Sequence, residues 1–595
     1  MSPSLARSKQ FDEEVPILII GGGPSGLLLA FMLDKLGVQS LIVERYTTRL
    51  AAPKAHALSP RSLEICRQFG LDVNEIRTIG TNRKDAYWVN FVTSLAGAHI
   101  GKLPYERMDP GVLDHTPTMI HNIPQPAFEE LIAKKISESK SVQIRKAHTF
   151  VSLRQYDGHI ITKIEDRTTK QTYKVKSTHV IACDGAKSSV REFLGIESEG
   201  ESSYETMMTI HFNADLRPVI KDRVGMLHWV VDPLVSGFII GYELSGNQVL
   251  ICNFDSAKWP VESWNEDHCR KVVDAAIGAK IDYDILSFRP WILSRKVARS
   301  YRESGVFLAG DAAHSFPPTG GLGLNSGLGD VHNLAYKLAA VHHGWATDSM
   351  LDTYDSERRQ VALVNSQQSV KNGKKIFDLL RTLGTTDANL ETARHNLFQN
   401  INDEIYMEDI KEGIEGQREH FDNLGLHIGY NYGDKHIPDN ASTYKPVCVS
   451  GARLPHAWIR LAGIEKVNLP AIDSSYIDGA SPEAVLQKTY STLDLCPFGS
   501  FTLLVDVNFA SQFESATQKA LKQISKGKTS ALSLQVVVLE LDFYLQPGQE
   551  RWIDIVPLKR GHAVLVRPDQ HILSVLDQDA GAKHIVGALK EHLAL

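Results

Sequence analysis

Short, continuous apolar runs separated by glycine-rich turns characterise the first half of the chain. An apolar run at 16–20 leads into a glycine turn and an apolar helical stretch at 21–33, and a second run follows at 40–43. Runs of this kind suit parallel strands buried on both faces. The segments 179–183 and 305–309 repeat the pattern, and an aspartate follows each of them. We therefore predict an α/β domain at the N-terminus.

Alternation of apolar and polar positions predicts antiparallel sheets in two further regions. The segment 151–175 alternates and is rich in turn residues, which indicates hairpins. Three alternating segments between 226 and 254 predict one sheet with a covered face and a functional face. Helical, charge-rich sequence runs from 326 to 417, with an apolar stripe at its start. The last 150 or so residues combine apolar strands with a helix, which indicates a second α/β unit.

These patterns predict a mixed α/β chain, α+β overall, in four parts. A Rossmann-type domain is expected to be discontinuous, because strands of the buried type occur on both sides of the alternating segments. The expected parts are a Rossmann-type domain at 13–200 and 290–375, an antiparallel-sheet domain at 201–289 with parts of 85–120, a helical and loop connector at 376–445, and a C-terminal domain at 446–595.

Composition narrows the classes of function. The 595 residues carry 64 Lys and Arg against 70 Asp and Glu, a net charge of -6, which argues against a dedicated nucleic-acid binder. No stretch approaches the roughly 20 apolar residues of a membrane-spanning helix. The six cysteines form no C-x-x-C pair and no zinc-like spacing, and no His and carboxylate cluster indicates a metal. We expect a cytoplasmic protein with reduced thiols, without a metal and without membrane insertion.

A glycine motif carries the first sign of chemistry. Gly21, Gly23 and Gly26 form G-x-G-x-x-G between a strand and a helix. Such glycines allow the backbone to approach a pyrophosphate, whose charge lies at the helix N-terminus. Glu44 ends the next strand, where a carboxylate can accept hydrogen bonds from ribose hydroxyls. The sequence therefore predicts dinucleotide binding, and this motif alone leaves NAD and FAD both open.

Two later segments resolve that choice through a resemblance. The segments 183–191 (CDGAKSSVR) and 310–314 (GDAAH) resemble class A flavoprotein monooxygenases, the FAD-dependent aromatic hydroxylases of the p-hydroxybenzoate and phenol hydroxylase type. The resemblance covers roughly 15–375 with the motifs in family order. It implies FAD as cofactor, with Asp184 near FAD and the passing nicotinamide and Asp311 at the ribityl chain. Arg45, Lys54 and Gln125 match further family positions that contact the cofactor. Lys54 replaces a frequent Arg there, and a solvated surface lysine is its alternative. Gly323, Leu324 and Asn325 are the remaining candidates for cofactor contact. The backbone amides of the last two precede or begin a helix, whose N-terminus stabilises the negative charge of reduced flavin.

The resemblance also implies an activity. NADPH or NADH would reduce FAD, O2 would add to give a C4a-hydroperoxide, and one oxygen atom would pass to a phenolic or polyketide-like aromatic substrate. The segment 53–61 is most similar to the chlorophenol hydroxylases, and His56 stands where phenol hydroxylases carry an aspartate. His56 is a candidate base for the phenol, alongside a packing or flavin-contacting role. Tyr242 is the second catalytic candidate, near a tyrosine of that branch, with a core position as its alternative. Alternation does not show which of His211, His228 and Trp229 face the flavin.

The C-terminal part resembles the thioredoxin-like domain of larger family members. Matching pieces are 451–455, 501–505 and 566–569. Cys496 lies near the place of a redox pair, but Gly499 takes the position of the second cysteine. Thiol–disulfide exchange requires a resolving thiol, so we expect a structural domain without redox activity. A homodimer is the assembly that this added domain suggests.

Two alternatives stay open at this point. A Baeyer–Villiger or epoxidising monooxygenase would keep the cofactor and act on a ketone or alkene. A non-catalytic binding protein of the same fold, like the GDP-dissociation inhibitors, would lack flavin. The intact segment 310–314 and the following Pro-Thr-Gly-Gly speak against this second alternative.

Overall fold

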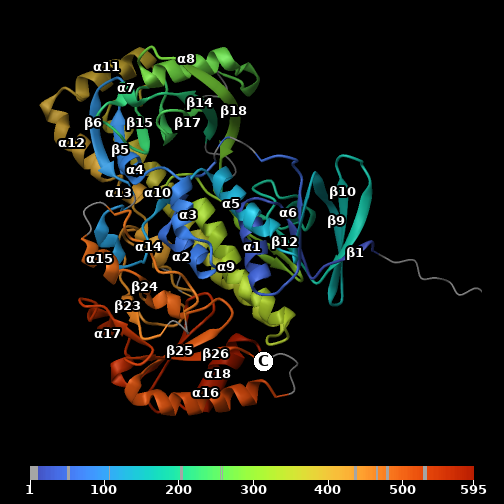
Figure 1. Cartoon of the computed structure of the whole chain (residues 1–595). Helices are drawn as coiled ribbons and strands as arrows, with labels where there is room; N and C mark the ends of the chain where they lie inside the picture. Colours follow the sequence, from blue (N-terminus) through green and yellow to red (C-terminus); the bar gives the residue numbers. More distant parts are fainter. Residues whose placement is uncertain are drawn as a thin grey trace, which may run out of the picture.

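The computed structural model shows four regions arranged around a central helical layer (Figure 1). It describes residues 11–49, 52, 54–105, 107–201, 205–254, 256, 259–433, 438–463, 467–477, 481–526 and 532–595. Two sheets of seven strands lie at opposite ends of the molecule, and the helices between them belong mainly to the N-terminal domain (Figure 1). Within the described residues no helix is long and apolar enough to span a bilayer.

The N-terminal domain is built on a six-stranded sheet with the order β20-β21-β12-β2-β3-β8. Its strands are β2 (Ile17–Ile20), β3 (Ser40–Glu44), β8 (Val142–Lys146), β12 (His179–Ala182), β20 (Arg302–Glu303) and β21 (Val306–Leu308). β2 pairs in parallel with both β12 and β3, and all its residues are buried. The buried strands predicted from the apolar runs are therefore confirmed. Helices α1 (Pro24–Lys35), α5 (Gln125–Ser137) and α9 (Leu322–His342) pack around it.

Three smaller sheets and several short helices complete this domain. The hairpins predicted at 151–175 form a four-stranded sheet that projects from the side of the molecule, with the order β1-β11-β10-β9 (Figure 1). Its strands are β1 (Glu13–Glu14), β9 (His148–Tyr156), β10 (His159–Asp166) and β11 (Thr172–Ser177). The remaining short elements are β4 (Ala57–Leu58), α2 (Pro60–Gln68), α3 (Val73–Ile79), α4 (Arg83–Ala86), β7 (His121–Asn122), α6 (Ser189–Phe193), β13 (Ser198–Glu199), β19 (Lys296–Ala298) and β22 (His314–Ser315).

The second region is a seven-stranded sheet with the order β18-β14-β17-β16-β15-β5-β6. Its strands are β5 (Trp88–Val92), β6 (His99–Pro104), β14 (Glu205–Ala214), β15 (Leu227–Val230), β16 (Gly237–Glu243), β17 (Asn247–Phe254) and β18 (Tyr283–Leu293). One face packs against α7 (Arg217–Ile220) and α8 (Glu266–Ile277). β18 runs through the boundary that we placed after residue 289, because a strand paired with β14 along its length continues past Pro290.

The other face of this sheet is covered by the helical connector. It comprises α10 (Asp352–Thr382), α11 (Leu390–Asn400), α12 (Glu404–Glu415), α13 (Arg418–Phe421) and α14 (Leu424–Ile428). Leu397, Ile414 and Phe421 of these helices share an apolar cluster with strand residues of the sheet. α10 runs through the boundary that we placed between residues 375 and 376, where the connector was expected to start. The helices therefore close the sheet face that we expected to be functional.

The C-terminal region is the second seven-stranded sheet, with the order β24-β23-β27-β26-β25-β28-β29. Its elements are β23 (Trp458–Leu461), α15 (Pro482–Gln487), β24 (Tyr490–Ser491), β25 (Phe501–Asp506), α16 (Ala510–Ile524), β26 (Leu534–Leu539), β27 (Phe543–Leu545), α17 (Arg551–Ile555), β28 (Ala563–Val566), β29 (Ile572–Leu576) and α18 (Ala582–His592). Burial raises the pKa of Cys496 to about 12, so its thiolate is disfavoured. The thioredoxin-like assignment stays a prediction.

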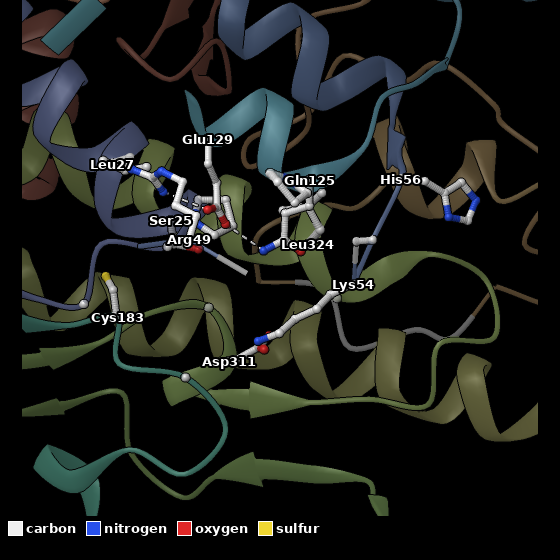
Figure 2. Close-up of a pocket in the computed structure, with 18 of the residues that line it drawn as sticks. Ser25, Leu27, Arg49, Lys54, His56, Gln125, Glu129, Cys183, Asp311 and Leu324 are labelled. Carbon is white, nitrogen blue, oxygen red and sulfur yellow. Dashed lines mark hydrogen bonds and ion pairs between the residues drawn. The ribbon is translucent and has the colours of Figure 1, made fainter. Parts of the chain in front are cut away.

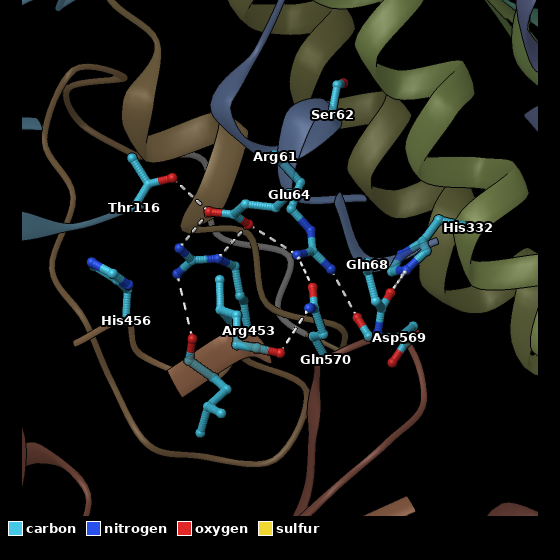
Figure 3. A network of polar contacts seen from close by, with 12 residues as sticks. Arg61, Ser62, Glu64, Gln68, Thr116, His332, Arg453, His456, Asp569 and Gln570 are labelled. Carbon is cyan, nitrogen blue, oxygen red and sulfur yellow. Dashed lines mark hydrogen bonds and ion pairs between the residues drawn. The ribbon is translucent and has the colours of Figure 1, made fainter. Parts of the chain in front are cut away.

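A buried polar network joins helix α2 to the C-terminal region (Figure 3). The Glu64 carboxylate accepts hydrogen bonds from Arg61 at 3.0 Å and from Arg453 at 2.8 and 2.9 Å. Burial alone would raise the pKa of Glu64, but the two guanidinium groups lower it to about 2. Arg61 also donates to Gln570 at 2.7 Å. Helix α2 is therefore held by charges that come from a region nearly 400 residues further along the chain.

Candidate active site

One long cavity runs from the glycine turn of the N-terminal domain to the connector face of the second sheet. Its volume is about 410 Å³. Ser25 and Leu27, in the first turn of helix α1, mark one end, and His56 lies well away from them (Figure 2). Asp311 lies between these ends (Figure 2). The cavity therefore has one end lined by backbone turns and charged groups and another lined by rings.

The glycine turn is shaped for a ligand at one position and for chain packing at the other two. A Cβ atom on Gly21 would lie 2.3 Å from the carbonyl oxygen of Cys183, and one on Gly26 would lie 2.1 Å from that of Gly21. Gly21 also has a φ of +107°, which disfavours any other residue. Gly23, the N-cap of α1, has no atom within 4 Å of its ideal Cβ position. The space in front of Gly23 and the helix N-terminus is suited to a pyrophosphate.

Charged and polar groups surround this turn. Glu44 accepts hydrogen bonds from the backbone N–H of Gly22 at 2.7 Å and of Tyr46 at 2.9 Å, which fixes its carboxylate at the cavity. Arg49 donates to Glu129 at 2.7 Å and to the carbonyl oxygen of Gly22 at 3.2 Å (Figure 2). Arg49 is a cavity cation that our sequence analysis missed, although it follows Glu44 by only five residues. A cation this close to the turn suits a phosphate group.

Four further predicted cofactor contacts also line the cavity. Gln125 donates to Glu129 at 2.8 Å, and the exposed side chains of Arg45 and Lys54 lie on the cavity wall. Asp184 accepts hydrogen bonds from Ser189 through Oδ2, while its Oδ1 is buried without a hydrogen-bond partner among the described residues. Asp184 therefore stabilises the start of α6 and keeps one acceptor free.

Asp311 and the start of helix α9 form the middle of the cavity. The carboxylate of Asp311 has no hydrogen bond within the described part of the chain, and it borders the cavity. Gly323 and Leu324 line the cavity in the first turn of α9. The Asn325 side chain does not: it accepts a hydrogen bond from the Ser59 N–H at 2.8 Å and donates to the Ala57 carbonyl oxygen at 3.0 Å. Asn325 thus fixes the segment after His56 against α9.

His56 and Tyr105 stand beside this helix turn. The Nε2 atom of His56 and the hydroxyl of Tyr105 are 2.8 Å apart, and both residues line the cavity. Burial lowers the pKa of His56 to about 4, so its imidazole is neutral at pH 7. Tyr242 packs edge-on against His56 with ring centroids 5.9 Å apart, and it does not line the cavity. Tyr242 thus lies behind His56 as one of its packing partners.

Aromatic rings close the far end of the cavity. Trp229 and Phe238 come from β15 and β16, and His420 and Phe421 come from α13. Trp229 and Phe238 have ring centroids 5.0 Å apart. Our sequence analysis missed the three residues other than Trp229. His420 and Phe421 were missed because α13 gives no motif and reaches the sheet only through the fold, and Phe238 because alternation does not show which face of the sheet it takes. His228 points elsewhere and hydrogen-bonds the Arg223 carbonyl oxygen, and His211 hydrogen-bonds Asn247.

The residues of the cavity fit an FAD molecule. The turn leaves space where a pyrophosphate would lie, acceptors at Glu44 and Asp311 suit ribose and ribityl hydroxyls, and a helix N-terminus faces the middle of the cavity. The family model described as an FAD binding domain matches residues 14–369. The chain belongs to this family. This confirms the predicted cofactor and the mixed α/β fold class.

Individual relatives extend over the rest of the chain. The 2,4-dichlorophenol 6-monooxygenase of Delftia acidovorans is 26% identical, over 98% of each chain. The tetracenomycin B2 monooxygenase-dioxygenase of Streptomyces olivaceus is 32% identical, over 60% of this chain and 68% of that one. The crystal structure of the flavin-dependent monooxygenase PieE, in complex with FAD and substrate, has a TM-score of 0.86 at 26% identity and covers 98% of this chain and 99% of its own. The predicted resemblance to flavoprotein monooxygenases is confirmed, and this FAD-binding chain is a monooxygenase of that group.

Proposed function

We propose that this flavoprotein hydroxylates an uncharged phenolic or polyketide-like aromatic substrate, with O2 and NADPH or NADH as cosubstrates. One observation carries the proposal: the FAD cavity continues into an aromatic chamber, and His56 and Tyr105 stand between the two. Similarity to a dichlorophenol monooxygenase and to a tetracenomycin monooxygenase-dioxygenase supports an aromatic substrate. FAD, when bound and reduced, supplies the electrons that activate O2.

The chamber favours a neutral aromatic molecule. The rings of Tyr105, Trp229, Phe238 and Phe421 line it together with aliphatic side chains. Among the cations labelled in Figure 2, Arg49 lies near the glycine turn and Lys54 lies between Asp311 and His56. None of the described Lys and Arg residues that line the cavity comes from β15, β16 or α13, which carry three of these rings. A carboxylate in this chamber would lose its hydration without gaining a cation, which costs several kcal/mol. The same walls exclude water from the reacting atoms.

His56 is proposed to accept a hydrogen bond from the substrate hydroxyl. Its Nε2 atom is engaged with Tyr105, so Nδ1 is the nitrogen available to a substrate. A phenol has a pKa near that of tyrosine, about 10, so complete proton transfer to an imidazole with a pKa of about 4 would cost about 8 kcal/mol. His56 therefore polarises the hydroxyl most effectively if the proton moves as the new C–O bond forms. Tyr242 is proposed to hold the His56 ring in place, a positioning role.

Product analysis tests the proposal directly. The purified holoenzyme is supplied with NADPH or NADH and a panel of phenols, hydroxynaphthalenes, aromatic carboxylates and aryl ketones. We expect substrate-dependent cofactor oxidation and a hydroxylated product, labelled from 18O2, with the neutral phenols and hydroxynaphthalenes. Formation of an ester from a ketone would identify a Baeyer–Villiger reaction and contradict the proposed hydroxylation. Turnover confined to carboxylates would contradict the neutral chamber.

The pH dependence of kcat/KM gives a prediction for His56. Protonated His56 cannot accept a hydrogen bond, so activity falls as pH drops through its pKa. Because burial lowers that pKa from 6.5 to about 4, we expect kcat/KM to stay level from pH 8 to about pH 5. The profile is measured after brief exposure to each pH, and His56→Gln is compared at pH 7, where we expect about a 100-fold loss. An acidic limb near pH 6.5 in the wild type would contradict this assignment.

Two further expectations belong to the proposal. Within the described residues all six cysteines are free, which supports a reducing compartment such as the cytoplasm. A homodimer stays a prediction from the presence of the C-terminal domain, and light scattering of the holoenzyme measures it.

A further inference from the structure

His420 is the one cavity-lining imidazole that lacks a hydrogen-bond partner within the described residues. Its side chain is 7% exposed, and its Nδ1 atom is buried without a partner. Its Nε2 atom is not enclosed in this way, and it makes no hydrogen bond with the described part of the chain either. Leaving such a polar group buried and unsatisfied is energetically costly. Native structures keep few buried groups of this kind, and each requires an explanation.

The position of His420 is fixed by rings. It stacks on Phe421 with centroids 4.5 Å apart and 13° between the planes. It also packs edge-on against Trp229, with centroids 5.3 Å apart. Both neighbours are aromatic surfaces without an acceptor for the imidazole N–H in this arrangement. The His420 ring is therefore fixed by packing, while its nitrogen atoms make no hydrogen bond with the described residues.

The backbone around His420 is anchored on both sides. Glu419 forms ion pairs with Lys371 and Lys375 at 3.1 and 2.6 Å. Asp422 forms one with Arg107 at 2.7 Å. The neighbours of His420 thus have charged partners, which hold α13 in place on both sides of His420. The unsatisfied imidazole is a local property of the chamber and does not come from a loosely packed segment.

The charge state of His420 defines what it can bind. Burial lowers the pKa of His420 to about 3, so the ring is neutral at pH 7, with one N–H donor and one acceptor nitrogen. A neutral imidazole suits a hydroxyl or carbonyl oxygen better than a carboxylate, whose burial there would lack a cation. A row of neighbouring rings leads from His56 to His420. The ring centroids are 6.1 Å apart for His56 and Tyr105, 6.5 Å for Tyr105 and Phe421, and 4.5 Å for Phe421 and His420.

We propose that His420 is a specificity-determining residue that hydrogen-bonds a second neutral oxygen substituent, a hydroxyl or carbonyl, on the aromatic substrate. The inference rests on the proposed function and narrows it. The substrate carries one hydroxyl at His56 and a further oxygen at His420, and its ring system lies among Tyr105, Trp229 and Phe421. A monohydroxylated arene fills the chamber but leaves His420 unsatisfied.

Substrate binding to the holoenzyme tests this assignment apart from turnover. Kd is measured by calorimetry and by the flavin difference spectrum for two matched sets: phenol and 1-naphthol, and their analogues with a second hydroxyl or an acetyl group. The variants are His420→Phe, which removes the hydrogen bond, and His420→Gln, which keeps a donor and an acceptor. His427→Phe is the matched control, because His427 is also buried with an unpartnered nitrogen but does not line the cavity.

We expect His420→Phe to weaken binding of the two-oxygen compounds by about 10- to 100-fold and to leave the one-oxygen compounds within about twofold. His420→Gln should keep most of the wild-type affinity for the two-oxygen compounds, and His427→Phe should leave the Kd of both sets unchanged. Equal weakening of both sets by His420→Phe, or no change in either, would overturn the assignment while wild-type hydroxylation keeps the proposed function. If the wild type binds no compound of either set, the assignment and the proposed function both fail.

Discussion

Gly23→Val produces a folded protein that does not retain FAD. The ideal Cβ position at Gly23 meets no atom within 4 Å, and its φ of −76° and ψ of −174° are acceptable for valine. The added side chain occupies the space where the backbone must approach a pyrophosphate. We expect FAD binding to weaken at least about 100-fold, about 3 kcal/mol. Flavin content after purification and fluorescence titration of the apoprotein measure this.

The neighbouring glycines and a distant one provide the comparison. Gly26→Val places a side chain against the Gly21 carbonyl oxygen, 2.1 Å from the first added atom, so it should lower stability as well as FAD binding. Gly587→Val is the matched control, because Gly587 lies on α18 with no atom within 4 Å of its Cβ position. We expect stoichiometric FAD in this control. A Gly23→Val protein with normal flavin content would show that the pyrophosphate does not lie at this turn.

Glu64→Gln destabilises the whole protein by about 3–5 kcal/mol. Glu64 is 2% exposed and is the carboxylate between Arg61 and Arg453 (Figure 3). Replacing it with an amide leaves two buried guanidinium groups without their shared counter-charge, and this is the condition in which breaking a buried pair costs most. Urea and thermal unfolding midpoints of the holoenzyme measure the loss.

An exposed ion pair provides the control for this loss of stability. Glu408 and Lys411 form an ion pair 3.5 Å apart with side chains 75% and 65% exposed, so Glu408→Gln should change stability by less than about 0.5 kcal/mol. Equal unfolding midpoints for Glu64→Gln and Glu408→Gln would mean that the buried network contributes little to stability.

The parts of the fold that the sequence predicts well are those set by local geometry. The turn at Gly21 needs a positive φ, and a side chain at Gly26 would collide with the Gly21 carbonyl oxygen. The glycine motif therefore identifies the strand–turn–helix unit in which it lies. Continuous apolar runs such as β2 and β12 need burial on both faces, which is typical of strands in a parallel sheet. Dinucleotide binding follows from these local features, and the choice of FAD follows from the resemblance of the segments 183–191 and 310–314 to the flavoprotein monooxygenases.

The substrate end of the cavity could not be predicted in the same way. Neighbouring residues of a strand point to opposite faces, so the pattern alone could not separate Trp229, which lines the cavity, from His228, which turns away. His420 and Phe421 reach the chamber only because the connector folds back over the sheet. The roles of His56 and Tyr242 stay predictions, although the structure places one at the cavity and the other behind it.

Helix α2 has a consequence for how this enzyme can be divided or recombined. The start of the helix is tied to Asn325 through Ser59 and Ser62. Further along the helix, Glu64 and Arg67 bind Arg453 and Asp494 of the C-terminal region. The family match ends at residue 369, yet cutting there would strip the helix beside His56 of its counter-charges. A chimaera with a relative's C-terminal region must import Arg453 and Asp494, or their equivalents, together with α2. The two regions therefore form one structural unit, and an engineer must exchange them together.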